Sequence, residues 1–269
     1  MITSLDNPRV REVVRLRKAR ERRREGVLVA EGVREVERAL AAGLVLRQMF
    51  HAPELLPAWP HGGEEVSARV LAKLAYRGEP EGVVAVFETP TRAIPTDASL
   101  LVVAVGIEKP GNLGAIARSA DAAGADGILV ADGQVDPWNP NAIRASTGSV
   151  FTLPIVEATR DDVAALTQQK VAAVLGAGTR HSDADLTQPT AFLIGAEDTG
   201  LDAAWRATAD LQVEIPMSGG AADSLNASAA AAVLLFEAVR QRGLGRERLD
   251  VELRARGDGS GQAGRSGRA

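Results

Sequence analysis

The feature that most constrains the fold of this chain is a series of short, nearly continuous apolar segments in its second half. Helical or loop-like stretches separate these segments. Such a pattern is typical of a parallel β-sheet covered by helices on both faces, that is, of an α/β fold. The predicted strands cover residues 100–107, 127–132, 150–157, 170–177, 190–197 and 211–217.

The first 88 residues alternate predicted helices and strands on a smaller scale. One helix is expected from Pro8 to Arg24, because Asp6 and Asn7 supply a cap and proline suits the first helical turn. Further strands are predicted at 27–32, 45–50 and 82–88, and further helices at 33–43 and 68–76.

The chain is therefore expected to contain two domains. A small α/β domain covers 1–88, and the proline-containing segment 89–98 is a linker. A larger parallel-sheet domain covers 99–245. The last residues, RARGDGSGQAGRSGRA (254–269), are rich in glycine and serine without apolar content, and we expect the tail 246–269 to be disordered.

Charge is distributed unevenly along the chain. The net charge is −4, yet nine of the sixteen residues from Arg9 to Arg24 are Lys or Arg. Local charge sets the field that a phosphate feels, so this run predicts contact with RNA or DNA, the alternative being a solvated helix face. The candidate RNA-binding residues are Arg15, Arg17, Lys18, Arg22, Arg23 and Arg24, together with Arg144 further along the chain.

Several function classes lose support from the sequence. There is no cysteine, and the three histidines have no ligand-spaced partner, so no metal site is expected. The sequence contains neither G-x-S-x-G, the motif of many acyl-transfer hydrolases, nor G-x-x-x-x-G-K-[ST], the P-loop motif, so both classes lose their main support. The opening MITSLDNPRV lacks a signal-peptide stretch and no run approaches transmembrane length, so a soluble cytoplasmic protein without membrane contact is predicted.

Three strand-to-loop junctions carry candidate chemistry. The first places Asn112 and Arg118 after strand 100–107, the second places Gly195 and Glu197 at the end of strand 190–197, and the third is EIPMSGGAADSLNASAA, 214–230. Ligands of parallel sheets bind beyond the carboxyl ends of the strands, so three such loops at one edge favour a binding site. Taken singly, each is also explained by a helix cap, a tight turn or good helix propensity.

Together the junctions resemble the three motifs of the SpoU/TrmH family of RNA ribose 2′-O-methyltransferases, within the SPOUT superfamily. The matching residues are Asn112-x-Gly114-x-x-x-Arg118, Gly195-x-Glu197-x-x-Gly200-Leu201 and Ile215-Pro216-Met217 followed by Ser224-Leu225-Asn226-x-Ser228-x-Ala230. RASTGSVF also resembles a segment that the family carries between its first two motifs. The loop before Leu225 is one residue longer than usual.

The resemblance implies a deep trefoil knot in the larger domain, a ribosomal-protein-like RNA-binding domain at the N-terminus, and a homodimer formed through the methyltransferase domain. It implies S-adenosylmethionine as the cofactor. The cofactor-binding residues that it implies are Gly195, Ile215, Leu225, Leu193, Ile194, Met217 and Ser224.

The catalytic residues that it implies are Arg118, Asn112, Glu197 and Asn226. Arg118 would anchor the target phosphate and stabilise the developing alkoxide. It is not expected to be the base, because a guanidinium keeps its proton. The others would orient Arg118 or the ribose.

The expected reaction is transfer of a methyl group to a ribose 2′-hydroxyl in structured RNA, with rRNA favoured over tRNA. A SPOUT-type methyltransferase acting on a base, and a non-catalytic RNA-binding factor of ribosome assembly, remain as alternatives. A nucleotide-binding oxidoreductase is disfavoured, because no glycine fingerprint is followed by an acidic ribose ligand. The RNA, the nucleotide and the proton acceptor stay open.

Overall fold

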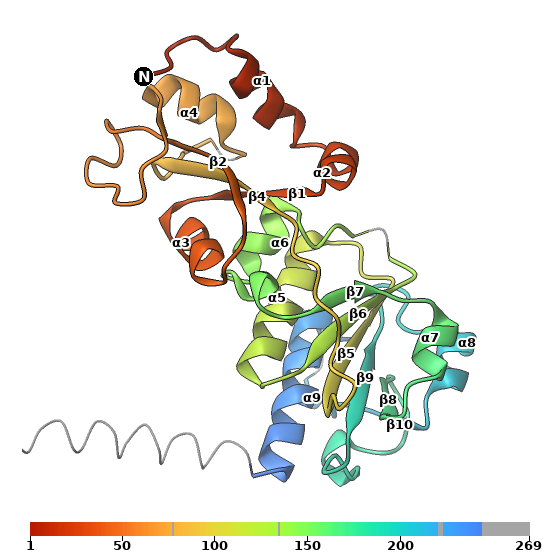
Figure 1. Cartoon of the computed structure of the whole chain (residues 1–269). Helices are drawn as coiled ribbons and strands as arrows, with labels where there is room; N and C mark the ends of the chain where they lie inside the picture. The colour runs from red at the N-terminus through yellow and green to blue at the C-terminus, as the bar shows by residue number, and fades with distance from the viewer. Residues whose placement is uncertain (77, 134, 220–222, 244–269) are drawn as a thin grey trace, which may run out of the picture.

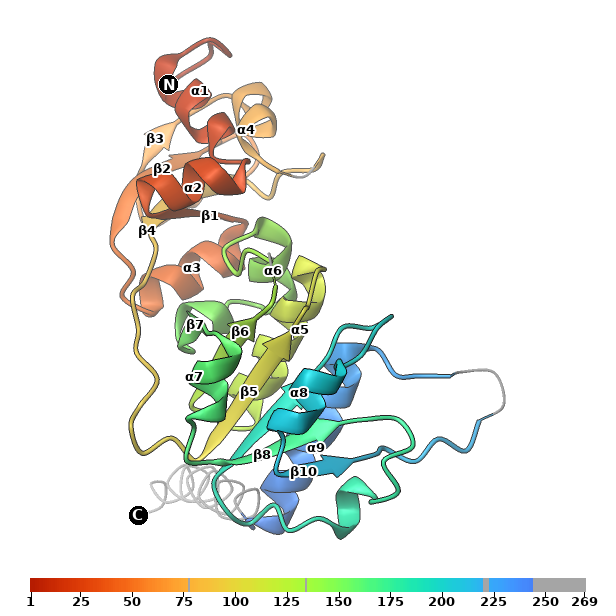
Figure 2. The ribbon, with the colours of Figure 1, turned by 90° about the vertical axis from the view of Figure 1, so that its right-hand side faces the viewer.

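The chain folds around two β-sheets that lie one above the other along the molecule (Figures 1 and 2). The structure is a computed structural model that describes residues 1–76, 78–133, 135–219 and 223–243. The tail expected to be disordered lies outside these residues. Part of the loop expected to be one residue longer lies outside them as well.

The N-terminal sheet has four strands in the order β1-β4-β2-β3. The strand β4 pairs antiparallel with both β1 and β2, so this sheet is mainly antiparallel. Its elements are α1 (Pro8–Arg15), α2 (Ala19–Glu25), β1 (Val27–Glu31), α3 (Val33–Ala41), β2 (Leu46–His51), β3 (Glu64–Glu65), α4 (Ala68–Leu74) and β4 (Val83–Glu88).

The C-terminal sheet has six parallel strands in the order β10-β8-β9-β5-β6-β7. Its strands are β5 (Leu100–Val105), β6 (Gly127–Ala131), β7 (Ile155–Glu157), β8 (Gln169–Ala173), β9 (Thr190–Ile194) and β10 (Leu211–Val213). The helices are α5 (Pro110–Ala122), α6 (Pro140–Ala145), α7 (Arg160–Ala164), α8 (Ala203–Thr208) and α9 (Ala227–Gln241), with short 3₁₀ turns η1 (Ser149–Phe151) and η2 (His181–Asp183).

Helices cover both faces of the C-terminal sheet, as the apolar strands predicted. On one face α5 and α9 pack side by side, and on the other lie α7 and α8 (Figure 1). The buried side chains of alternate strand residues divide accordingly: Val102 and Phe192 pack with Leu234 of α9, whereas Val103 and Leu193 pack with Trp205 of α8. The predicted α/β class is thereby confirmed.

Two sequence predictions about local structure were wrong. The helix expected from Pro8 to Arg24 is two helices, broken between Arg15 and Ala19. At the break, the Arg22 guanidinium donates to the carbonyl oxygens of Leu16 and Arg17, which are 2.7 and 2.9 Å away. The strand expected from residue 150 begins only at Ile155, because Val150 and Phe151 form a buried 3₁₀ turn.

The N-terminal and C-terminal parts share one hydrophobic core. The cluster that holds Leu28 of β1 and Phe87 of β4 continues into Ile143 of α6 and Phe151 of η1. A buried ion pair between Arg22 and Asp136 also joins the two parts, with both side chains almost inaccessible to water. The sheets are therefore docked on each other by apolar and ionic contacts.

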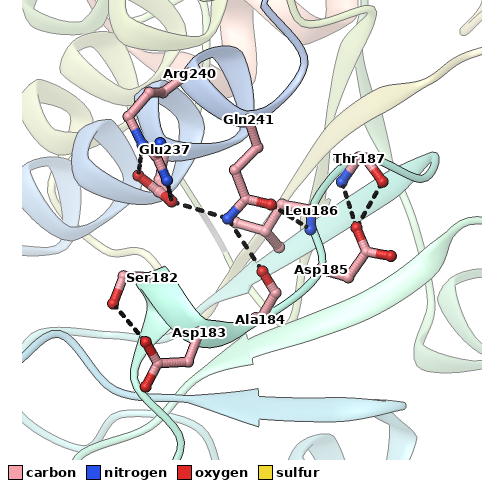
Figure 3. A network of polar contacts seen from close by, with 9 residues as sticks. All are labelled: Ser182, Asp183, Ala184, Asp185, Leu186, Thr187, Glu237, Arg240 and Gln241. Carbon is pink, nitrogen blue, oxygen red and sulfur yellow. Dashed lines mark hydrogen bonds and ion pairs between the residues drawn. The ribbon is translucent and has the colours of Figure 1, made fainter.

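The C-terminal end of α9 is held by a polar network (Figure 3). The Gln241 amide donates to the Ala184 carbonyl at 3.0 Å, and its oxygen accepts from the Leu186 N–H at 2.9 Å. Glu237, one turn earlier, accepts two hydrogen bonds from Arg240 and one from Gln241. These contacts fix the far end of the helix whose first residue lies in the candidate site.

Candidate active site

Three polar side chains from the three predicted junctions meet beyond the carboxyl ends of β5 and β9. The Asn226 side-chain nitrogen donates to a Glu197 oxygen and, at 3.3 Å, to the Asn112 side-chain oxygen. The Asn226 oxygen accepts from the Ser228 backbone N–H at 3.0 Å and so caps α9. One residue therefore ties the start of α9 to the loop after β9 and to α5.

The carboxylate of Glu197 is held as an anion. Lys109 Nζ lies 2.5 Å from Glu197 Oε2. Hydrogen bonding from Lys109 is the main reason that the pKa of Glu197 is lowered, and a hydrogen bond involving Asn112 acts in the same direction. The same contact with Glu197 raises the pKa of Lys109. At neutral pH Glu197 is thus an acceptor that orients N–H groups, and it is a poor proton carrier.

Beside this network lies a cavity of about 340 Å³. A volume of that size suits a small organic cofactor. Six of the seven residues expected to bind cofactor line it: Ile194, Gly195, Ile215, Met217, Ser224 and Leu225. Leu193 was expected there too but is fully buried on the opposite face of β9, because successive strand residues point to opposite faces.

Most of the charged groups that line this cavity are carboxylates. Three carboxylates, Glu197, Asp198 and Asp223, face one guanidinium, that of Arg206. Arg206 donates its Nε–H to the Leu201 carbonyl oxygen at 2.7 Å. Because Glu197 is already paired with Lys109, two carboxylates and one guanidinium remain, so the lining is weakly acidic beside its apolar walls.

Gly195 is required by the packing of the loop that forms this cavity. A Cβ at this position would lie 2.4 Å from the carbonyl carbon of Gly200 and 2.6 Å from the nitrogen of Leu201. No side chain fits between two backbone segments this close. The glycine that sequence analysis singled out after β9 therefore lets the loop 195–201 close on itself at the cavity wall.

Arg118 is not part of the Asn112–Glu197–Asn226 network. Six residues of helix separate it from Asn112, which corresponds to about 240° around α5 and about 9 Å along its axis. It lines a separate open hollow of about 500 Å³ with Arg38 of α3. Its guanidinium has no hydrogen bond or ion pair within the described part of the chain.

The basic residues of the N-terminus have different surroundings. Arg22 was expected to contact RNA, but this prediction was wrong because its guanidinium is buried on Asp136 and on two backbone carbonyls. Arg17 donates to the Lys73 and Ala75 carbonyl oxygens. The side chains that remain exposed on α1, α2 and the turn between them include those of Arg15, Lys18, Arg23 and Arg24.

Arg144, also expected to contact RNA, is an exposed residue of α6. Within the described residues, no group of three or more His, Cys, Asp or Glu side chains has the arrangement needed to hold a metal ion. None of the helices in that part of the chain is long and apolar enough to cross a membrane.

The fold and the cavity define an α/β protein with a ligand site at the carboxyl ends of parallel strands. Residues 99–236 match the model of the SpoU rRNA Methylase family, and residues 7–85 match that of the MRM3-like substrate binding domain. The chain therefore belongs to the SpoU rRNA methylase family, as its motifs predicted.

Similar proteins are known from sequence and from structure. The 23S rRNA (uridine(2479)-2′-O)-methyltransferase of Streptomyces viridochromogenes is 39% identical, over 84% of this chain and 86% of the relative. A crystal structure of an RNA 2′-O ribose methyltransferase has a TM-score of 0.79 at 43% identity, covering 90% of this chain and 98% of the other. The AdoMet-bound rRNA methyltransferase of Sinorhizobium meliloti has a TM-score of 0.79 at 32% identity, with 89% and 97% covered.

Sequence reasoning missed three residues of this region. Lys109 lies directly before Pro110 at the start of the first motif, which was the available signal. Arg38 and Asp136 carried no signal, because each acts on a residue more than one hundred positions away in the chain.

Proposed function

We propose that this protein is an S-adenosylmethionine-dependent methyltransferase that modifies the ribose 2′-hydroxyl of a nucleotide in rRNA. The observation that carries the proposal is the Asn112–Glu197–Asn226 network at the rim of a carboxylate-rich cavity of about 340 Å³. Membership of the SpoU family supports it, as does the AdoMet bound in the structure of a relative that is 32% identical.

The cofactor would supply an already activated methyl group, so this chain's residues mainly position the acceptor. Backbone groups at Gly195, Ile215 and Leu225 and the walls at Ile194 and Met217 would hold the cofactor. Leu225 is followed by Asn226, whose amide would orient the ribose. Ser224 supports the same loop.

Arg118 would bind the phosphate of the target nucleotide and stabilise the oxyanion that develops at the 2′-oxygen. An arginine guanidinium keeps its proton in proteins and cannot act as a base, so the role of Arg118 is electrostatic. Because Arg118 lines a hollow distinct from the cofactor cavity, the proposal includes a homodimer through the methyltransferase domain, in which each copy brings its Arg118 to the cavity of the other.

The exposed face of α9 supports such a dimer. Val233 and Phe236 are 36% and 48% exposed on this helix, although both are large apolar side chains. Burial against a second copy would remove this surface from water. The small side chains of Ala229 and Ala232 on the same helix would allow close approach.

We infer the remaining features that the family implies for this chain as well. A trefoil knot would involve residues 214–219, residues 223–226 and the loop 195–201, and residues from each of these segments line one cavity. Residues 1–88 would form the RNA-binding domain, 89–98 the linker and 99–245 the methyltransferase domain. The exposed Arg15, Arg17, Lys18, Arg23, Arg24 and Arg144 would contact RNA, and the protein would act in the cytoplasm without a metal.

Ribosomal RNA is preferred over tRNA because the relative from Streptomyces viridochromogenes is named for 23S rRNA. The test uses purified protein, S-adenosylmethionine with a labelled methyl group, and unmodified transcripts of 23S rRNA and tRNA. Nuclease digestion should release labelled 2′-O-methyl nucleosides from 23S rRNA. Label in a base would favour a base methyltransferase, and no transfer to any RNA would favour a non-catalytic RNA-binding factor.

A further inference from the structure

The hollow that holds Arg118 also receives an arginine from the N-terminal part. Arg38, in the last turn of α3, lines it opposite α5. The rest of the lining comes from the ends of α3 and α5 and from the segment 147–152. The hollow measures about 500 Å³ and is open to solvent, so that a nucleotide phosphate can enter it.

The segment 147–149 is shaped to hold Arg38 in this place. Arg38 Nη1 donates to the carbonyl oxygen of Thr147. The stem of Arg38 lies over Gly148, where a Cβ would approach Arg38 Cδ to 2.8 Å. Thr147 itself has a φ of +51°, which is rare for a β-branched residue and costs on the order of 1–3 kcal/mol.

The charge balance of the hollow favours an anion. Arg38 and Arg118 contribute two positive charges, and Asp121 contributes one carboxylate. Asp121 already accepts a hydrogen bond from Ser149 Oγ at 2.9 Å. Arg38 donates only to a neutral carbonyl among its contacts here, and Arg118 has no partner in the described residues. Arginine guanidinium groups with free N–H donors bind phosphate in a two-pronged geometry.

We propose that Arg38 is an RNA-positioning residue, which together with Arg118 binds one phosphate of the RNA substrate. The inference rests on the proposed function and deepens it: the N-terminal domain would contribute a residue to the reaction site itself. The buried pair Arg22–Asp136 and the shared core fix that domain on the methyltransferase domain, so the helices α3 and α5 that carry the two arginines are placed relative to each other before RNA binds.

The test measures the dissociation constant of a fluorescent, unmodified 23S rRNA transcript over a range of KCl concentrations. The variants are Arg38→Met, which keeps the apolar stem over Gly148 and loses the charge, and Arg38→Lys, which keeps the charge. Arg47→Met is the matched control, because Arg47 is an exposed arginine of β2 already paired with Glu88.

Arg38→Met should weaken RNA binding about tenfold at low salt. It should also reduce the slope of log Kd against log salt by about 1, the amount expected for the loss of one phosphate contact. Arg38→Lys should recover the slope but only part of the affinity, because it lacks the planar fork. The double variant Arg38→Met/Arg118→Met should lose less than the sum of the single losses. Binding of S-adenosylmethionine should not change in any of the three.

An Arg38→Met slope equal to that of the wild type or of Arg47→Met would overturn the proposal. If Arg38→Met also lowers the unfolding temperature, Arg38→Lys distinguishes the two roles. A phosphate contact predicts that Arg38→Lys restores the wild-type slope of log Kd against log salt, whereas a purely structural role predicts that it does not. Failure of the proposed function is distinguishable, because it appears as absent methyl transfer by the wild-type protein, whereas the slope reports RNA binding alone.

Discussion

Asn226 donates its side-chain amide to the carboxylate of Glu197, and the same side chain caps α9 through its oxygen. Glu197 in turn is bound by Lys109. The orientation of the polar group nearest the cofactor cavity thus depends on a carboxylate that must remain charged. The start of α9 and the loop after β9 behave as one unit because of this contact.

Glu197→Gln should therefore slow methyl transfer while leaving most of the cofactor affinity. The variant removes the charge that binds Lys109 and orients Asn226, and a tenfold to hundredfold loss of kcat corresponds to about 1.4–2.8 kcal/mol. Steady-state methylation of 23S rRNA gives kcat, and calorimetry gives the affinity for S-adenosylmethionine. Asp161→Asn, an exposed carboxylate on α7, is the control. A wild-type kcat in Glu197→Gln would contradict the role.

Arg118→Ala should abolish methyl transfer with little change in cofactor binding. Arg118 lines a hollow separate from the proposed cofactor cavity, so its loss would remove the proposed phosphate contact and oxyanion partner without altering the cavity walls. The assay is labelled methyl transfer, with calorimetry for the cofactor. Arg160→Ala, an exposed arginine at the start of α7, should retain activity. Preserved turnover in Arg118→Ala would remove this residue from catalysis.

Much of the fold was predictable because each strand is a local apolar run. The strands β5, β6, β8 and β9 lie within their predicted ranges or within one residue of them. The break between α1 and α2 was not predictable, since Leu16 and Arg22 are placed by burial and by Asp136 rather than by local propensity. The apolar residues 150–151 were predicted as strand because a buried 3₁₀ turn contains the same kinds of apolar side chain as a buried strand.

In the candidate site, too, some residues could be predicted from local sequence and others could not. Asn112, Glu197 and Asn226 were identified because each belongs to a short local motif after a strand. Arg38 acts on a partner 109 positions away, so only the folded chain brings it to the site. Lys109 lies 88 positions from Glu197, and its place directly before the first motif was the only sequence signal for it. Leu193 was misplaced by one position because a motif gives proximity along the chain and not which face of β9 a side chain occupies.

Gly195→Ala should weaken cofactor binding and destabilise the protein. The added Cβ would overlap the backbone of Gly200 and Leu201, so the loop must open at the cavity wall. We expect at least a tenfold loss of affinity for S-adenosylmethionine, about 1.4 kcal/mol. Gly111→Ala is the matched control, since a Cβ there meets nothing within 4 Å. Equal cofactor affinities in both variants would show that the loop tolerates the displacement.

Arg22→Met should destabilise the whole chain by about 3–5 kcal/mol, because it leaves the buried Asp136 carboxylate without its cation. The double variant Arg22→Met/Asp136→Asn should recover much of the loss, since the asparagine oxygen can still accept from the Trp138 N–H. Urea unfolding measures both. Arg23→Met, an exposed neighbour on α2, is the control. A small effect of the single variant would mean that the docking of the two parts does not depend on this pair.

Glu237 should make the stability of the C-terminal end of α9 sensitive to acid. Its hydrogen bonds with Arg240, and then with Gln241, lower its pKa from the usual 4.5 to about 2. A carboxyl group whose pKa is lower in the folded state stabilises that state above pH 4.5, and this contribution is lost as the pH falls from 4.5 towards 2.

Wild type should therefore exceed Glu237→Gln in free energy of unfolding at pH 7, with the difference shrinking below pH 4.5. The difference should not exceed about 1 kcal/mol, because Arg240 is largely exposed and solvent screens the pair. Urea unfolding at pH 7, 5, 4 and 3 measures it. Glu37→Gln, an exposed glutamate on α3, controls for loss of a surface carboxylate. A difference that stays constant down to pH 3 would show that Glu237 acts through its size and hydrogen bonds, without a contribution from its charge.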